Sequence, residues 1–220
     1  MTVIDFRADS RITREQRSAL REFASELGQD IAGLAQRLGL KVYRKRLPSD
    51  LSGYLEFAPD LGSSSGFVIF VNSAKPIERQ RFTTAHEIAH FVLHKDEPEF
   101  RERFLNSAEV FDLTAANRAS DEWLEMNGPY MRAEREADAF AVNLLMPGHL
   151  VRASRAFRLN RPELLAHQLG LSKAAVANRF KELSRYRRGR KDLEVLEMTG
   201  FQCFEQLEGV ERSAMEAKQA

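Results

Sequence analysis

The sequence predicts an α+β fold in which a small sheet and several helices share one core. Two observations carry this prediction. Three short runs rich in β-branched and aromatic residues lie close together between residues 42 and 72, and turn-forming residues separate them. The segments on either side carry apolar residues at spacings of three and four, which is typical of amphipathic helices. With 220 residues, 43% of them hydrophobic, the chain can bury a core of ordinary size.

The first helical segment begins at a capping box formed by Thr13 and Gln16. Apolar residues then recur at helical spacing through residues 20–38. We therefore expect one helix, or two helices interrupted near Gly28, that end at Gly39.

The expected strands are Val42-Tyr43, residues 53–57 and residues 66–72. Pro48, Pro59 and the glycine- and serine-rich residues 62–66 separate them. We expect about three strands that lead directly into the next helix. Such a sheet usually has only a structural role. In a peptidase its edge strand could also pair with an extended substrate.

The most informative motif is His86-Glu87-Ile88-Ala89-His90, in a helix expected to run from near Pro76 to His94-Lys95. The two histidines stand one turn apart on the same face, so both rings can reach one metal ion. Two neutral imidazoles leave a divalent ion acidic enough to lower the pKa of a bound water to about 7. Glu87 can then accept the water's proton and later deliver it to a leaving amine. The alternative, a buried helix whose histidines merely pack, gives no reason for the glutamate.

A catalytic zinc ion needs a third protein ligand. The helical pattern of residues 132–147 supplies candidates, and a helical wheel places Glu134 beside the apolar face. Glu136 falls outside that face and is more typical of a solvated charge, so it is the weaker alternative. Asp138 follows Glu134 by one turn, where its carboxylate can accept the outward N–H of a ligating histidine.

Two further parts of the site stay open at the level of sequence. His94 is interpreted as a neighbour of the ligands or a surface residue, with a ligand role as the minor alternative. Residues 96–129 are expected either to shape a cleft or to form a simple surface connection, with a short helix over residues 120–126. The group that stabilises an oxyanion is not assigned; the candidates by residue type are Tyr130, His149 and His167.

The C-terminal third predicts two helices around a turn at Gly170, within residues 162–183. This shape resembles a helix-turn-helix, followed by a basic cluster in residues 185–191. The residues that could face a DNA groove are Lys173, Asn178, Arg179 and Lys181. Because the net charge is only +1, we favour a structural or substrate-docking role over DNA binding.

Composition indicates a cytoplasmic protein. The single cysteine, Cys203, excludes an internal disulfide and fits a reducing compartment. Residues 1–10 do not resemble a signal peptide, and no apolar run approaches the length that spans a membrane.

Residues 79–94 and 134–147 resemble the ImmA/IrrE-type family of zinc-dependent metallopeptidases, and the match extends over roughly residues 30–183. The resemblance implies a zincin-like fold with Zn²⁺ held by His86, His90 and Glu134 and with Glu87 as catalytic base. It also implies a cytoplasmic peptidase that cleaves a DNA-binding repressor, such as a helix-turn-helix repressor, in stress, mobile-element or toxin–antitoxin control.

We accordingly expect a zincin-like metallopeptidase domain in residues 1–160. A helix-turn-helix-like pair packed on that core is expected in residues 161–191, and a C-terminal extension in residues 192–220. Two other functions are compatible with the same residues. The chain could be a zinc-containing transcriptional regulator that binds DNA through residues 162–191, or a protein that binds a repressor without cutting it.

Overall fold

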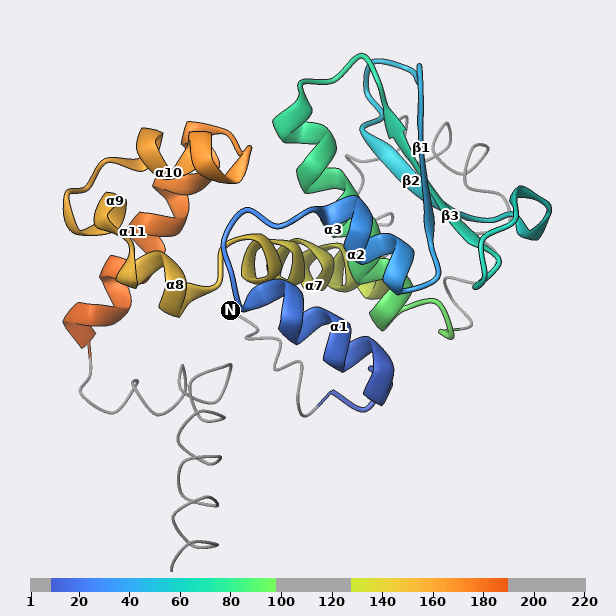
Figure 1. Cartoon of the computed structure of the whole chain (residues 1–220), viewed down its shortest axis with the longest axis horizontal. Helices are drawn as coiled ribbons and strands as arrows, with labels where there is room; N and C mark the ends of the chain where they lie inside the picture. The colour runs from blue at the N-terminus through green and yellow to red at the C-terminus, as the bar shows by residue number, and fades with distance from the viewer. Residues whose placement is uncertain (1–8, 98–127, 190–220) are drawn as a thin grey trace, which may run out of the picture.

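The computed structural model describes residues 9–97 and 128–189, with side chains described for 9–97 and 132–185. Figure 1 shows the sheet at one end of the molecule and a group of C-terminal helices at the other. Two long helices, α3 (Ile77–Leu93) and α7 (Gly128–Leu145), cross between them. The mixed α+β class predicted from the sequence is confirmed.

The N-terminal helices form where the sequence predicts them. Helix α1 (Arg14–Ala24) starts at the expected capping box, in which Thr13 and Gln16 bond each other's backbone N–H groups. Helix α2 (Ile31–Arg37) follows, and the break between the helices falls at Gly28, whose φ of +83° is readily adopted only by glycine.

The sheet contains the three expected strands, β1 (Lys41–Lys45), β2 (Gly53–Phe57) and β3 (Phe67–Asn72). Their order is β1-β3-β2, with β1 parallel and β2 antiparallel to the central β3. The short 3₁₀ helix η1 (Pro59–Leu61) lies in the connection between β2 and β3. Strand β2 is therefore at one edge of the sheet, where helix α3 also contacts it.

Helix α3 is buried on most of its surface because it contacts β2 and β3 as well as α2 and α7. Its contact with α7 is the most extensive between any two elements of the described chain. The apolar face of α7 is buried, and its residues are Ala137, Phe140, Ala141, Leu144 and Leu145. This packing brings the polar residues at the start of α7 beside the middle of α3.

Gly53 permits the close approach of β2 to its neighbours. A Cβ at this position would lie 2.5 Å from the carbonyl oxygen of Phe70 and 2.6 Å from Cγ2 of Thr83. Since Phe70 belongs to β3 and Thr83 to α3, glycine lets β2 contact both elements.

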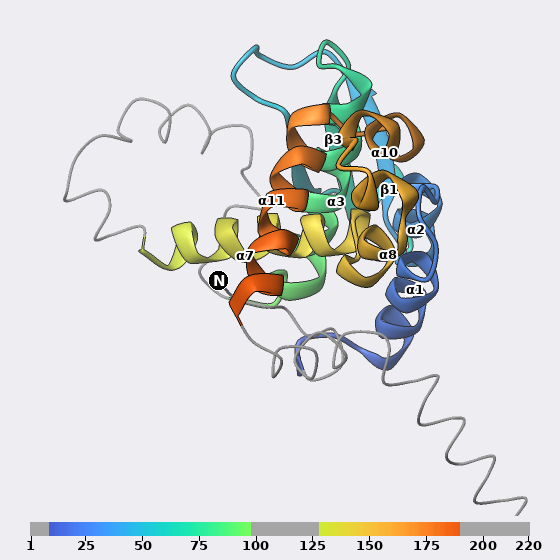
Figure 2. The same ribbon diagram turned by 90° about the vertical axis from the view of Figure 1, so that its left-hand side faces the viewer.

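The C-terminal helices are α8 (Gly148–Ala153), α9 (Arg155–Arg158), α10 (Pro162–Leu169) and α11 (Lys173–Gly189). Figure 2 shows α11 running alongside α10 and crossing the line of α7. As the sequence predicts, α10 and α11 meet at Gly170, which takes a left-handed conformation. Most of the segment 96–129 expected to shape a cleft or form a connection, with its short helix over 120–126, and the whole extension expected in 192–220 lie outside the described residues. No helix in the described part of the chain is both long and apolar enough to span a membrane.

Candidate metal centre

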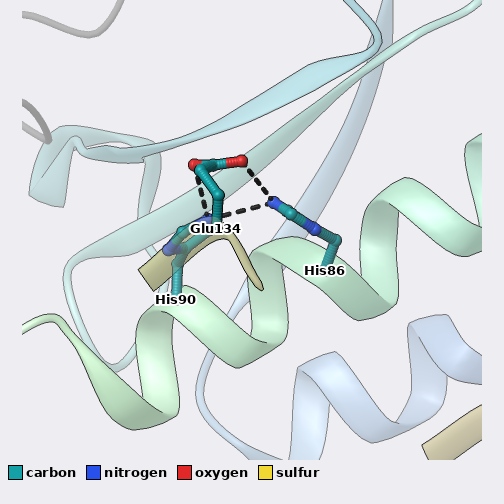
Figure 3. A group of neighbouring side chains, drawn as sticks. All are labelled: His86, His90 and Glu134. Carbon is teal, nitrogen blue, oxygen red and sulfur yellow. Dashed lines mark hydrogen bonds and ion pairs between the residues drawn. The ribbon is translucent and has the colours of Figure 1, made fainter. Parts of the chain in front are cut away.

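Three side chains from two helices converge on one point (Figure 3). His86 and His90 lie on one face of α3, and Glu134 comes from α7. The two Nε2 atoms of the histidines lie 3.0 Å apart. Oε2 of Glu134 lies 3.3 Å from Nε2 of His86, and Oε1 lies 3.2 Å from Nε2 of His90. The helix crossing thus brings together the three ligands predicted from the sequence.

The spacing of these atoms fits a metal ion. Two ligands about 2.0–2.1 Å from one ion in a tetrahedral site lie roughly 3.3–3.4 Å apart. The two Nε2 atoms, 3.0 Å apart, are close to that value, and each lies 3.2 or 3.3 Å from a different carboxylate oxygen of Glu134. Two imidazoles and one carboxylate also form a donor set that zinc accepts, so His86, His90 and Glu134 could hold a metal ion with little rearrangement.

Asp138 makes the contact expected of it. Its Oδ1 lies 2.9 Å from Nδ1 of His86, on the side of the ring opposite Nε2. An N–H at Nδ1 that donates to this carboxylate leaves the Nε2 lone pair of His86 available to a metal ion.

His94 lies beside a ligand, as one of its two expected alternatives has it, whereas Glu136 differs from its expected surroundings. The wheel places Glu136 in solvent, and this prediction is wrong: its side chain is only 18% exposed and accepts a hydrogen bond from Arg11. His94 is 1% exposed, so its surface alternative is wrong as well. Nδ1 of His94 lies 3.1 Å from Nδ1 of His90, and its Nε2 lies 3.3 Å from Oε2 of Glu136. Neither residue belongs to the group that could hold the metal.

Glu87 lies beside the group but is enclosed by protein. Its residue is 8% exposed, and burial raises the pKa of its carboxyl to about 7. The positive charge of His86 and a backbone hydrogen bond from Leu55 of β2 oppose this increase in pKa. A carboxyl group with a pKa near neutrality can both take up and release a proton, as the expected role of Glu87 requires.

The electrostatics of the three ligands are strongly coupled. Burial disfavours the charged form of His86, but hydrogen bonds with Asp138 and Glu134 outweigh burial and raise its pKa to about 10. Burial likewise opposes ionisation of Glu134, yet its bonds to both histidines lower its pKa far below the usual range. Burial lowers the pKa of His90, which keeps that ring neutral. A bound cation would therefore replace the proton on His86 as the partner of Glu134.

Of the three oxyanion candidates, the side chains of His149 and His167 are described, and both residues lie on helices after α7. Tyr130 lies in the first turn of α7, where side chains are not described. His149 lies on α8 and His167 on α10, both beyond the C-terminal end of α7. Because Glu134 and Leu145 are eleven residues apart in one helix, roughly 16 Å of helix separates the group from that end.

Arg179, one of the candidate DNA-contacting residues of the C-terminal helix pair, is bonded within the protein. Arg179 is 5% exposed, and it donates to the carbonyl oxygen of Met146, to Asn143 and to Glu182. It therefore attaches α11 to the end of α7, which agrees with the favoured structural role and removes Arg179 from the candidates for a DNA contact. By contrast, the expected candidates Lys173 and Lys181 are exposed and line a hollow of about 650 Å³.

A known family model matches the part of the chain that contains the two histidines of this site. Residues 35–120 match the model of the Peptidase_M78 family, described as an IrrE N-terminal-like domain. The match includes the sheet, His86, Glu87 and His90, and it ends before Glu134 and Asp138. A comparison with curated proteins gives no match.

Proposed function

We propose that this chain, a member of the ImmA/IrrE-type family through its IrrE N-terminal-like domain, is a zinc-dependent endopeptidase. One observation carries the proposal: His86, His90 and Glu134 each place a ligating atom within 4.8 Å of the others, with the buried carboxyl of Glu87 beside them. In this proposal the sheet, α3 and α7 form a zincin-like core, and α10 and α11 form a helix-turn-helix-like pair packed on it.

When bound, zinc would act as a Lewis acid that makes a water molecule a nucleophile at neutral pH. His86, His90 and Glu134 are the residues that would hold the ion. Glu87 accepts the proton that the attacking water loses and transfers it to the amine of the leaving fragment. In the metal-free chain burial raises the pKa of Glu87 to about 7, which makes its carboxylate a better base toward water than one of ordinary acidity.

The edge of β2 away from β3 pairs with no strand of the described residues, and we propose that an extended substrate pairs there. Backbone bonds from Asn72 to Ser52 and from Ala58 to Gly66 show that residues 52 and 58 face β3. In an antiparallel ladder alternate residues face opposite ways, so residues 53, 55 and 57 direct their backbone groups outward. The backbone bond from Leu55 to Glu87 agrees with this assignment.

The outward backbone groups of β2 therefore lie next to the proposed catalytic residue. No strand of the described residues pairs with that side of β2. A substrate peptide paired there would extend past Glu87 and the metal ligands, with its backbone held by hydrogen bonds that do not depend on its sequence.

We further propose that the substrate is a DNA-binding repressor with a helix-turn-helix domain and that the cleavage occurs in the cytoplasm. The support for this class of substrate is the family resemblance, together with a C-terminal helix pair that exposes Lys173 and Lys181 around a hollow where a partner could dock. The internal use of Arg179 makes the same helices a poorer DNA-binding surface.

The proposal is tested with the purified full chain and its Glu87→Gln variant, both treated with a chelator and reloaded with Zn²⁺. Metal analysis gives the zinc bound per chain, and mass spectrometry of a peptide library gives the bonds cut. We expect one zinc ion in both proteins and cleavage only with the unaltered chain. Absence of zinc binding, or equal cleavage by Glu87→Gln, would contradict the proposal. Zinc binding without cleavage by either protein would favour the regulator or repressor-binding alternatives.

A further inference from the structure

A series of polar contacts extends from the back of His90 away from the metal centre. Nδ1 of His90 lies 3.1 Å from Nδ1 of His94, and Nε2 of His94 lies 3.3 Å from Oε2 of Glu136. Arg11 donates from Nη1 to the same oxygen over 3.0 Å. These residues come from α3 and the residue that follows it, from α7 and from the segment before α1, so three parts of the chain meet behind one ligand.

The chemistry of the two imidazole rings determines which group donates and which accepts in each hydrogen bond of this series. A neutral imidazole carries a proton on one nitrogen and a lone pair on the other. If Nε2 of His90 binds a metal, its Nδ1 must carry the proton and donate it to Nδ1 of His94. His94 then carries its own proton on Nε2, which donates to the carboxylate of Glu136. A carboxylate only accepts, so Glu136 favours this tautomer of His94 and, through it, the matching tautomer of His90.

Arg11 holds the far end of the series in place. Besides Glu136, its guanidinium contacts Asp9 at 2.7 Å and Glu97 at 3.4 Å. Asp9 precedes α1 and Glu97 follows α3, so Arg11 joins the N-terminal segment to the end of the helix that carries the histidines. The cation also keeps Glu136 ionised, because its positive charge and hydrogen bond favour the carboxylate.

We propose that His94, Glu136 and Arg11 are positioning residues that hold His90 in its Nδ1–H tautomer and direct its Nε2 toward the metal. This inference rests on the proposed metal site and extends it to residues that do not touch the ion. Two of the three residues, Arg11 and Glu136, lie outside the segment that matches the family model. His86 and Asp138 have the equivalent contact on the other side of the centre, so each ligating histidine is oriented by its own partner.

His94 could orient His90 or could simply fill space in the core. Two substitutions distinguish these roles. His94→Asn places an amide oxygen near the position of Nδ1, so it keeps an acceptor for His90 but loses ring volume. His94→Phe keeps the ring volume but removes the acceptor. If His94 only fills space, the Phe variant should retain metal affinity better than the Asn variant. If His94 positions His90, the order should be reversed.

The experiment measures Zn²⁺ affinity of the full chain by competition with a chromophoric chelator, with circular dichroism to confirm folding. For His94→Phe we expect roughly 10- to 100-fold weaker binding, the usual effect of removing the partner of a ligating histidine, and for Glu136→Gln, which acts through His94, a smaller loss. His94→Asn should lose less than His94→Phe. Arg11→Gln should weaken binding several-fold, whereas its matched control Arg14→Gln, an exposed arginine three residues on, should leave it unchanged.

A second readout reports the tautomer directly. In the zinc-loaded protein, nitrogen-15 NMR of the imidazoles should show His90 bound through Nε2, with an Nδ1–H proton that exchanges slowly with water. In His94→Phe that proton should exchange fast. Failure of the unaltered chain to bind zinc would overturn the metal site and this inference together. Tight zinc binding that is equal in His94→Phe, or better there than in His94→Asn, would overturn the positioning role alone.

Discussion

Asp138 lies one turn after Glu134 on α7, and its Oδ1 accepts a hydrogen bond from Nδ1 of His86 over 2.9 Å. One helix therefore supplies both the third ligand of the proposed centre and the partner that orients the first. The two carboxylates contact opposite nitrogens of the same ring, since Glu134 lies 3.3 Å from Nε2. Any displacement of α7 relative to α3 would disturb both contacts at once.

Replacement of Asp138 should therefore weaken metal binding without removing a ligand. Asp138→Asn can present its amide nitrogen to Nδ1 of His86 and so stabilise the wrong tautomer. We expect a loss of Zn²⁺ affinity of roughly 10-fold or more, measured by competition with a chelator. The control is Asp60→Asn, an exposed aspartate of η1 outside the metal centre, which should bind as the unaltered chain does. Equal affinity in both variants would show that Asp138 does not orient His86.

The metal-free protein should lose stability between pH 7 and 9. The pKa of His86 is about 10 in the folded chain, against 6.5 for an unperturbed histidine. A histidine whose pKa is raised by folding stabilises the protein fully below pH 6.5, and this contribution is lost as the pH rises toward 10. The free energy of unfolding should thus fall by about 1 kcal/mol per pH unit in this range.

Urea denaturation of the chelator-treated protein at pH 7, 8 and 9 measures this slope. His86→Gln removes the titrating group, so its stability should vary less with pH. Zinc must displace the same proton, and zinc affinity should therefore rise up to about tenfold per pH unit in the same range. Identical slopes for the unaltered chain and His86→Gln would show that His86 is not held in its charged form.

Arg179 should contribute to stability although it lies far from the metal ligands in the sequence. Arg179→Met leaves the carbonyl oxygen of Met146 and the side-chain oxygen of Asn143 without this donor, in a region where Arg179 is 5% exposed. We expect the free energy of unfolding to fall by roughly 2–4 kcal/mol. Lys181→Met is the matched control, because it removes the same charge from an exposed position and should change stability by less than about 0.5 kcal/mol. Similar denaturation midpoints for the two variants would contradict the docking role of Arg179.

Gly53→Ala should displace β2 from the position that the site requires. The added Cβ meets the backbone oxygen of Phe70 at 2.5 Å, and backbone cannot turn aside as a flexible side chain can. We expect a loss of roughly 1–3 kcal/mol in stability and weaker peptidase activity with zinc affinity retained, because β2 does not supply a metal ligand. Gly33→Ala on α2 is the control, since the nearest atom there belongs to the side chain of Asp30. A fully active and stable Gly53→Ala protein would show that the close approach is not needed.

Local sequence patterns predicted the parts of the fold that local physics determines. The capping box at Thr13, the break at Gly28 and the turn at Gly170 each depend on residues that are near in the chain. Glu134 could be preferred over Glu136 because a helical wheel shows which side chains lie next to the apolar stripe.

A helical wheel of α7 does not show which residues from other parts of the chain pack against that helix. Glu136 contacts His94 and Arg11, which are 42 and 125 residues away in the sequence, so its pairing could not be predicted from its own helix. The burial of Arg179 was missed for the same reason, because its acceptors at Met146 and Asn143 belong to a different helix end.

The central claim is that Glu87 enables hydrolysis of a bond in another cellular protein. The most direct measurement is a mass-spectrometric survey of new protein termini in cells that express this chain, beside cells that express Glu87→Gln, with and without stress. Because Gln cannot accept the proton of the attacking water, we predict new termini only with Glu87 intact, and we predict that they lie in a DNA-binding repressor. Identical sets of termini from the two cell lines under every condition would contradict the claim.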